Sequence, residues 1–322
     1  MATSVTALSR RPRRLGERLL GGDEVAHIVT WMFAALVIAV TLALLIALWV
    51  KADPARSKFG FGFLASSLWN PVTNEYGALP FIYGTVVTSF LALLISVPLG
   101  VGAAIYLSEL ASPRISDGLT FLVELLAAVP SVIYGLLAIF TLVPLMRNYV
   151  EPALRGIFGF LPIFDGPIFG FGYLTAAVIL SVMTFPFIIS VSREALMSVP
   201  REQREAALAL GATKWESTWQ VVVPFARLGI FGSIFLALAR ALGETMAVTM
   251  VIGNDPAIHA SLFANGYTIA AVIANEFTEA TGDVYLSALV ELGLVLFVLT
   301  IVINGLAQLM IVLTTRKGSA RA

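Results

Sequence analysis

The sequence predicts an all-α polytopic membrane protein with six transmembrane helices. Of its 322 residues, 58% are hydrophobic and 12% are charged, and the mean hydropathy is +0.91. Because a typical soluble domain has about 25% charged residues, a chain of this composition is expected to fold in lipid. The formal net charge of zero argues against nucleic-acid binding. The lack of cysteine and the presence of only two histidines argue against a metal site.

Six apolar runs are long enough to cross a bilayer, which takes about 20 helical residues. An even number of spans puts both termini on the same side of the membrane. Proline residues within the runs are expected to kink their helices. The runs lie at about 29–50, 81–107, 119–146, 172–192, 228–252 and 285–313, and the prolines are Pro98, Pro130, Pro144 and Pro186.

The distribution of positive charge predicts which side is cytoplasmic, because cytoplasmic loops are enriched in Lys and Arg. These residues are concentrated in 1–28, 193–227 and 314–322 and are sparse in the alternate connections. We therefore predict cytoplasmic tails at 1–28 and 314–322, a first transmembrane helix at 29–50, and a cytoplasmic 193–227 loop. The Arg-rich start lacks the short apolar core and cleavage site of a signal peptide.

Two of the predicted outer connections interleave aromatic residues with Gly and Pro, at 59–71 and 156–173. Such segments are typical of the aromatic belt at the level of the lipid headgroups. An outer gate or a docking surface for a partner is the alternative interpretation.

The 193–227 loop contains a polar, helix-prone stretch between two apolar runs, REQREAALALGATKWESTWQVVVPF at 201–225. We predict a short helix over Arg201–Leu210. Pro200 suits its first position, and Gly211 stands where a left-handed C-cap is usually found.

This helix is predicted to have one apolar face, because Ala206, Ala207 and Leu210 recur at helical spacing. Such a face can press into a groove of a partner protein. Alternatively, the helix lies on the inner surface of the membrane. The side chains expected to remain in water are Arg201, Glu202 and Arg204.

The same stretch resembles the EAA loop of ABC-importer permeases, the segment that docks onto a separate ATPase in that family. The matching residues, to which the resemblance assigns ATPase coupling, are Glu205, Ala206, Ala207, Gly211 and Pro224. The chain itself has no G-x-x-x-x-G-K-[ST] loop to cradle nucleotide phosphates. We therefore expect no cofactor on this chain, with ATP and Mg on partner ATPase subunits.

A second group of charged residues lies in the predicted fifth span, where Arg240 falls near the bilayer midplane. A lone Arg at that depth costs about 2.5–3.5 kcal/mol on insertion scales, so it is expected to face a cavity, a partner or a ligand. Glu244, four residues later, is predicted to share its helical face. One interpretation is an i,i+4 ion pair that neutralises both side chains.

The other interpretation is an anion path, because the planar Arg240 guanidinium matches phosphate or carboxylate oxygens. The Glu244 carboxylate only accepts hydrogen bonds, so it would favour a ligand that still carries a proton, such as hydrogenphosphate, over sulfate. Gly243 and Gly253 allow close helix approach or a local break.

The stretch RALGETMAVTMVIGN at 240–254 closely resembles the signature of the PstC-type permeases of bacterial phosphate ABC importers. WNPVTNEYGALPFIYGTVVTS at 69–89 and LLAAVPSVIYG at 125–135 are similar to the same family, and the resemblance covers most of residues 60–315. It implies an ABC type-1 importer permease fold for 81–313 and phosphate translocation at Arg240 and Glu244.

The resemblance also implies a multi-subunit complex in the bacterial cytoplasmic membrane. Its other members would be a PstA-type permease, two PstB-type ATPase subunits and an extracytoplasmic PstS-type phosphate-binding protein. Beyond those proteins the expected partner is membrane lipid, with no nucleic acid. Two alternatives remain: a permease for sulfate or molybdate, and an ion-coupled secondary transporter that uses Arg240 and Glu244 as a relay.

Three further ionisable residues have open assignments. Glu124 and Glu291 lie inside apolar runs, where a carboxylate can snorkel, pair with a neighbouring chain, remain neutral or take part in transport. His259 lies in an acidic outer loop and is expected to be solvated.

Overall fold

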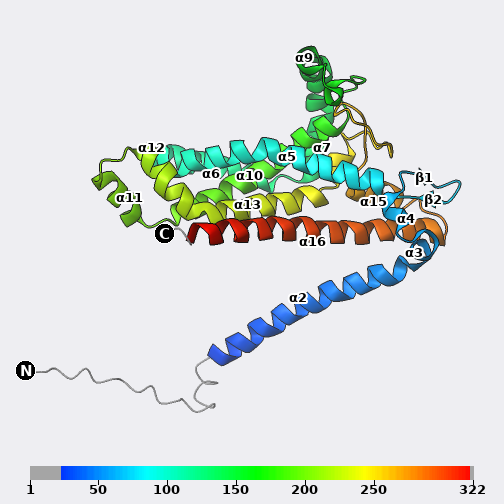
Figure 1. Ribbon diagram of the computed structural model, residues 1–322, viewed down its shortest axis with the longest axis horizontal. Coiled ribbons are helices and arrows are strands. Elements are labelled where there is room, and N and C mark those ends of the chain that lie inside the picture. Colours follow the sequence, from blue (N-terminus) through cyan, green and yellow to red (C-terminus); the bar gives the residue numbers. More distant parts are fainter. Residues whose placement is uncertain (1–22, 320–322) are drawn as a thin grey trace, which may run out of the picture. The chain divides into compact units, whose positions relative to one another are not determined.

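The computed structural model describes the backbone of residues 23–319 and the side chains of residues 25–309. Predictions for residues 1–22 and 320–322, which include the Arg-rich start, lie outside this range. The chain divides into two units, Met1–Val50 and Lys51–Ala322. In the first unit, the helix α2 (Asp23–Lys51) is apolar over most of its length and contains the predicted 29–50 span (Figure 1).

The second unit is a helical bundle with one two-stranded hairpin in its described part. Its longer helices are α5 (Leu79–Ile105), α6 (Pro113–Ala128), α10 (Tyr173–Met197), α13 (Val223–Gly243) and α16 (Asp283–Ser319). Its shorter helices are α3 (Asp53–Phe59), α4 (Gly62–Ala65), α7 (Ser131–Leu137), α8 (Val143–Leu145), α9 (Glu151–Phe158), α11 (Arg201–Ala209), α12 (Lys214–Ser217), α14 (Met246–Thr249) and α15 (Ile269–Glu276). Wider π-helical turns are η1 (Tyr106–Leu110), η2 (Ala138–Leu142), η3 (Met146–Val150) and η5 (Thr218–Val222), and η4 (Pro162–Phe164) is a 3₁₀ turn.

The predicted number of membrane-spanning helices is confirmed within the described residues. Six helices are long and apolar enough to cross a membrane: Val25–Lys51, Leu79–Leu110, Ser131–Phe158, Tyr173–Met197, Lys214–Gly243 and Asp283–Leu309. Their bounds differ from the apolar runs at several ends, because polar residues such as Lys214 continue a helix as well as apolar ones do.

The centre of the bundle is formed by α5, α10 and α13, with α6 against α10 and α16 against α13 (Figure 1). Small residues line the contacts: Ala92, Ala176 and Ala237 are fully buried. Gly100 on α5 lies directly against the Ile188 side chain of α10. Small side chains let helix backbones approach closely, which maximises packing where lipid supplies little hydrophobic driving force.

The third predicted span, 119–146, is wrong as a single helix. The helix α6 ends at Ala128, Val129 is extended with φ −67° and ψ 128°, and helical structure resumes at Ser131. Pro130 explains the break, because proline disfavours a helical conformation in the residue before it and cannot donate to the helix. The helix long enough to span therefore begins at Ser131 and continues to Phe158.

The aromatic 59–71 segment leads into the hairpin of β1 (Trp69–Asn70) and β2 (Glu75–Tyr76), which pair antiparallel. The Trp69 ring packs edge-on against Phe81 with centroids 4.8 Å apart, and its Nε1 donates to Glu276 Oε2 at 2.8 Å. Phe61, in contrast, is 93% exposed. The segment thus combines buried rings that fix the hairpin with an exposed ring that is available to lipid or to a partner.

Candidate functional site

Arg240 lies in the last turn of α13, beside the aromatic ring of Phe187 on α10. The guanidinium carbon is 4.4 Å from the ring centroid, which is a cation–π contact. The Arg240 Nε is buried without a hydrogen-bond partner, and no ion pair involves this residue among the described side chains. A partly buried cation therefore has no oppositely charged partner among residues 25–309.

The prediction that Glu244 shares a helical face with Arg240 is wrong. The helix α13 ends at Gly243, and Glu244 is extended with φ −69° and ψ 126°. Its Oε1 accepts a long hydrogen bond of 3.4 Å from the Ala247 backbone N–H in the first turn of α14. The i,i+4 ion pair is absent from this structure, so the two side chains do not neutralise each other through a shared helix.

The predicted 228–252 span also ends early, because the chain leaves the helix after Gly243. The local break considered for Gly243 is therefore observed. Beyond it, Gly253 has φ +92°, and a Cβ there would collide with the Asn265 side chain. A parallel bridge joins Gly253 to Gly266. The helix carrying Arg240 thus stops alongside α16, and the one-turn helix α14 and an irregular segment follow it (Figure 1).

The 193–227 loop contains the predicted short helix, α11, which spans Arg201–Ala209. Gly211 has φ +91°, so the left-handed residue expected after the helix is present. Pro200 is the extended N-cap, with ψ 141°, instead of the first helical residue. No residue of α11 is buried, and Leu210 is 91% exposed.

The residues assigned to ATPase coupling by resemblance lie along this exposed region. Glu205, Ala206 and Gly211 are exposed, and Ala207 is half-buried. Pro224 is exposed in the first turn of α13. Between them, Thr213 and Glu216 form a capping box that starts α12. The structure thus presents these residues from the second half of α11, the turn after it and the start of α13.

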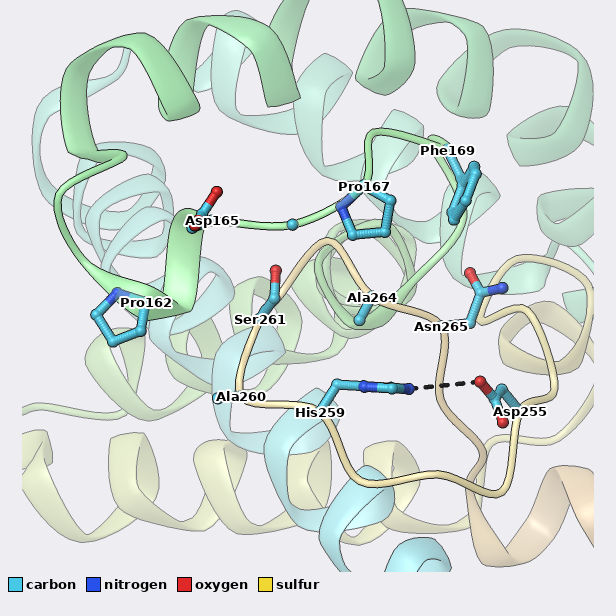
Figure 2. A pocket seen from close by; sticks show the side chains of 11 residues that line it. Pro162, Asp165, Pro167, Phe169, Asp255, His259, Ala260, Ser261, Ala264 and Asn265 are labelled. Carbon is cyan, nitrogen blue, oxygen red and sulfur yellow. Dashed lines mark hydrogen bonds and ion pairs between the residues drawn. The ribbon is translucent and has the colours of Figure 1, made fainter.

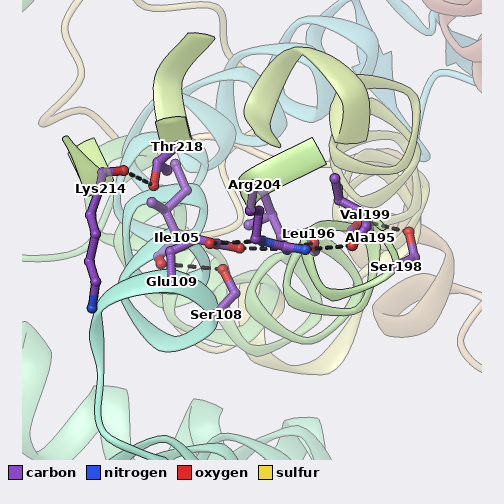
Figure 3. Close-up of polar contacts among 10 residues, drawn as sticks. All are labelled: Ile105, Ser108, Glu109, Ala195, Leu196, Ser198, Val199, Arg204, Lys214 and Thr218. Atoms are coloured by element: carbon purple, nitrogen blue, oxygen red, sulfur yellow. Dashed lines mark hydrogen bonds and ion pairs between the residues drawn. The ribbon is translucent and has the colours of Figure 1, made fainter. Parts of the chain in front are cut away.

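Arg204 was predicted to remain in water, and this prediction is wrong. Its guanidinium contacts the Glu109 carboxylate with Nη2–Oε1 at 2.8 Å and Nε–Oε2 at 3.2 Å, and it also donates to two backbone carbonyls. Figure 3 shows it between Glu109 and the end of α10. The sequence gives no signal for this pair, because the partners lie 95 residues apart.

The remaining ionisable residues have separate environments. Glu124 on α6 is exposed, whereas Glu291 on α16 is 9% exposed and its Oε2 has no hydrogen-bond partner. His259 Nε2 lies 3.4 Å from Asp255 Oδ2. Both residues line a pocket of about 460 Å³ between the 162–169 and 255–265 loops (Figure 2). The expectation that His259 is simply solvated is therefore incomplete.

Comparisons with known proteins agree with this architecture. The model of the family described as binding-protein-dependent transport system inner membrane component matches residues 96–312. The phosphate transport system permease protein PstC of Mesorhizobium japonicum is 48% identical over 293 residues, which cover 90% of each chain. A protein of the same name from Xylella fastidiosa is 45% identical over 294 residues, again covering 90% of each chain.

Solved structures give the same fold at low identity. A chain of a bacterial alginate ABC transporter, in complex with an alginate-bound periplasmic protein, superimposes with a TM-score of 0.57 and 18% identity. The match covers 90% of this chain and 96% of the other. A second alginate importer structure gives a TM-score of 0.56 at 19% identity, covering 90% and 98%.

The six apolar helices, the family model and the curated relatives define a multi-pass membrane protein of the ABC-importer permease class. The chain belongs to the binding-protein-dependent transport system inner membrane component family. Within that family, the resemblance of the chain to PstC-type permeases is confirmed.

Proposed function

We propose that this chain is the membrane-spanning permease subunit of an ATP-driven importer that carries inorganic phosphate across the bacterial cytoplasmic membrane. Its relatives of 45–48% identity are named as phosphate transport permeases, which supports this cargo. Transport proceeds by alternating access, with both termini in the cytoplasm. ATP is hydrolysed on separate subunits, and the permease has no catalytic site of its own.

The main support for the proposal is that Arg240 carries a buried nitrogen without a hydrogen-bond partner in the described part of the chain. Buried polar groups in proteins are normally hydrogen-bonded, yet the Arg240 Nε has no partner among the described residues. The contact with Phe187 holds the guanidinium without cancelling its charge. A phosphate that enters beside it offers oxygens matching the fork of N–H donors. The missing partner is therefore supplied by the transported anion.

Glu244 is assigned to discrimination between oxyanions. It follows the end of α13 and is half-buried, so its carboxylate can act near Arg240 without forming the helical ion pair. An acceptor-only carboxylate stabilises a ligand that donates a hydrogen bond and repels one that cannot. Hydrogenphosphate donates, whereas sulfate is fully deprotonated near neutral pH. This difference favours phosphate over sulfate.

The α11 region is assigned to ATPase coupling through Glu205, Ala206, Ala207, Gly211 and Pro224. Its exposure supports this role, because a docking helix must present side chains that the permease does not cover. The partners are two PstB-type ATPase subunits with bound ATP and Mg, a PstA-type permease and a PstS-type phosphate-binding protein. ATP-driven closure of the ATPase subunits moves α11, and phosphate leaves toward the cytoplasm as the bundle reorients around Arg240.

The experiment that tests this function is reconstitution of the complete complex in liposomes, with ATP on the side of the membrane that α11 faces. We expect uptake of labelled phosphate that requires ATP and the binding protein and persists when the proton gradient is collapsed. Unlabelled sulfate and molybdate should compete poorly. Uptake that follows the proton gradient and ignores ATP would contradict the proposal in favour of a secondary transporter, and strong competition by sulfate or molybdate would change the cargo.

A further inference from the structure

Arg204 joins three segments of the chain through one guanidinium group. In addition to the two contacts with Glu109, Nη2 donates to the Leu196 carbonyl at 2.7 Å, and Nη1 donates to the Val199 carbonyl. Glu109 lies in η1 at the end of α5, and Leu196 lies in the last turn of α10. Arg204 itself lies in α11. The three segments meet at this one side chain (Figure 3).

The geometry distinguishes this pair from an ordinary surface ion pair. Exposed pairs contribute little because water screens them and flexible side chains must be ordered. Here the Arg204 side chain is 21% exposed and the Glu109 side chain 11%. The carboxylate is held by two guanidinium nitrogens, the arrangement that fixes both distance and direction. One of the carbonyls that Arg204 binds belongs to Leu196 in the last turn of α10, so the side chain also contacts the C-terminal end of that helix.

The contact between Arg204 and Glu109 connects α11 to helices at the centre of the bundle. The helices α5 and α10 pack along each other, and α10 carries Phe187, which contacts Arg240. The Glu109 end of this path is a π-helical turn, a feature often found at functional positions in helices. Since no residue of α11 is buried, hydrophobic burial holds this helix weakly. The polar contacts of Arg204 therefore form its firmest described attachment to α5 and α10.

We propose that Arg204 is a positioning residue that transmits movement of α11 to α5 and α10 through Glu109 and the end of α10. The inference rests on the proposed ATPase docking at α11. A docked ATPase that displaces α11 moves these helices as one body as long as the guanidinium holds all three segments. Without it, α11 shifts while the helices around Arg240 stay in place, and hydrolysis continues without translocation.

The test is the ratio of phosphate taken up to ATP hydrolysed, measured on the complete complex in liposomes. In Arg204→Gln and Glu109→Gln we expect assembly with the ATPase and continued ATP hydrolysis, with the ratio reduced about fivefold or more. Arg204→Lys keeps the charge but not the fork, so it should restore part of the loss. Arg201→Gln is the matched control, because Arg201 is an exposed arginine on the same helix and should keep the wild-type ratio.

The possible outcomes separate this inference from the proposed function. If the wild-type complex takes up no phosphate, the proposed function fails and the inference fails with it. If the wild type transports and both Gln variants keep the wild-type ratio, the inference alone is overturned. Loss of assembly in both variants would also overturn it, because the pair would then serve folding instead of coupling.

Discussion

The guanidinium carbon of Arg240 lies 4.4 Å from the centroid of the Phe187 ring, across the contact between α13 and α10. An aromatic face attracts the cation without supplying the full negative charge that a carboxylate would. The arginine is therefore held in position while its charge remains available to an anion. This relationship leads to predictions for both residues.

Replacing Phe187 by Leu should weaken phosphate binding, because the guanidinium loses the surface that orients it. Cation–π contacts contribute about 0.5–2 kcal/mol, so the KM for uptake should rise by about 2- to 30-fold. Phe187→Tyr keeps the aromatic face and should remain close to wild type. Phe185→Leu on the same helix is the control, since Phe185 packs in a separate apolar cluster. Equal effects of the Phe187→Leu and Phe185→Leu variants would count against a specific role for the ring.

Replacing Glu244 by Gln should weaken the selectivity for phosphate over sulfate. The amide can still accept the hydrogen bond from Ala247, so the local backbone is expected to persist. Because Gln can donate to a fully deprotonated oxyanion, sulfate should inhibit phosphate uptake about tenfold more strongly than in the wild type. The measurement is a competition assay with labelled phosphate, and the exposed Glu279→Gln serves as control. Unchanged sulfate inhibition would remove Glu244 from the selectivity argument.

Adding a methyl group at Gly84 should destabilise the protein. A Cβ there would collide with the backbone carbonyl of Tyr267, which cannot move aside as a flexible side chain does. Overpacking of this kind costs about 1–3 kcal/mol. Gly102→Ala in the same helix meets no atom within 4 Å, so it should be neutral or slightly stabilising. The check is thermal unfolding in detergent, where equal melting temperatures for the two variants would contradict the packing at Gly84.

The purified chain alone should not hydrolyse ATP, because it contains no phosphate-cradling glycine loop. Activity should appear only when the ATPase subunits are added. The measurement is phosphate release from ATP by a preparation that is free of those subunits. Turnover that survives removal of every other protein would contradict the assignment of hydrolysis to a partner.

Much of the architecture could be predicted because a bilayer imposes a length and an apolar composition on each span. The number of spans followed from this constraint. The family followed from short sequence motifs, and the left-handed Gly211 followed from its position after a predicted helix. Helix ends inside apolar runs were harder to predict. The breaks at Pro130 and Gly243 leave hydropathy unchanged, so 119–146 and 228–252 each looked like one helix.

The side-chain partners in the candidate site depended on the tertiary fold. Arg240 could be singled out from its depth in an apolar run, but its contact with Phe187 requires the packing of α10 on α13. Glu244 was misplaced because the helix ends one residue before it. Arg204 was misplaced because its partner, Glu109, comes from the far end of another helix. Residue spacing along one helix predicts which side chains are neighbours on that helix. It does not predict contacts between different helices, such as those of Arg240 and Arg204.

The most direct test of the central claim is phosphate uptake by the assembled complex carrying Arg240→Ala. The control is Arg227→Ala, which removes an exposed arginine from the same helix. If the transported anion supplies the partner of the Arg240 guanidinium, uptake should be abolished in the first variant and retained in the second, with both complexes assembled. Normal phosphate uptake by the Arg240→Ala complex would contradict the claim.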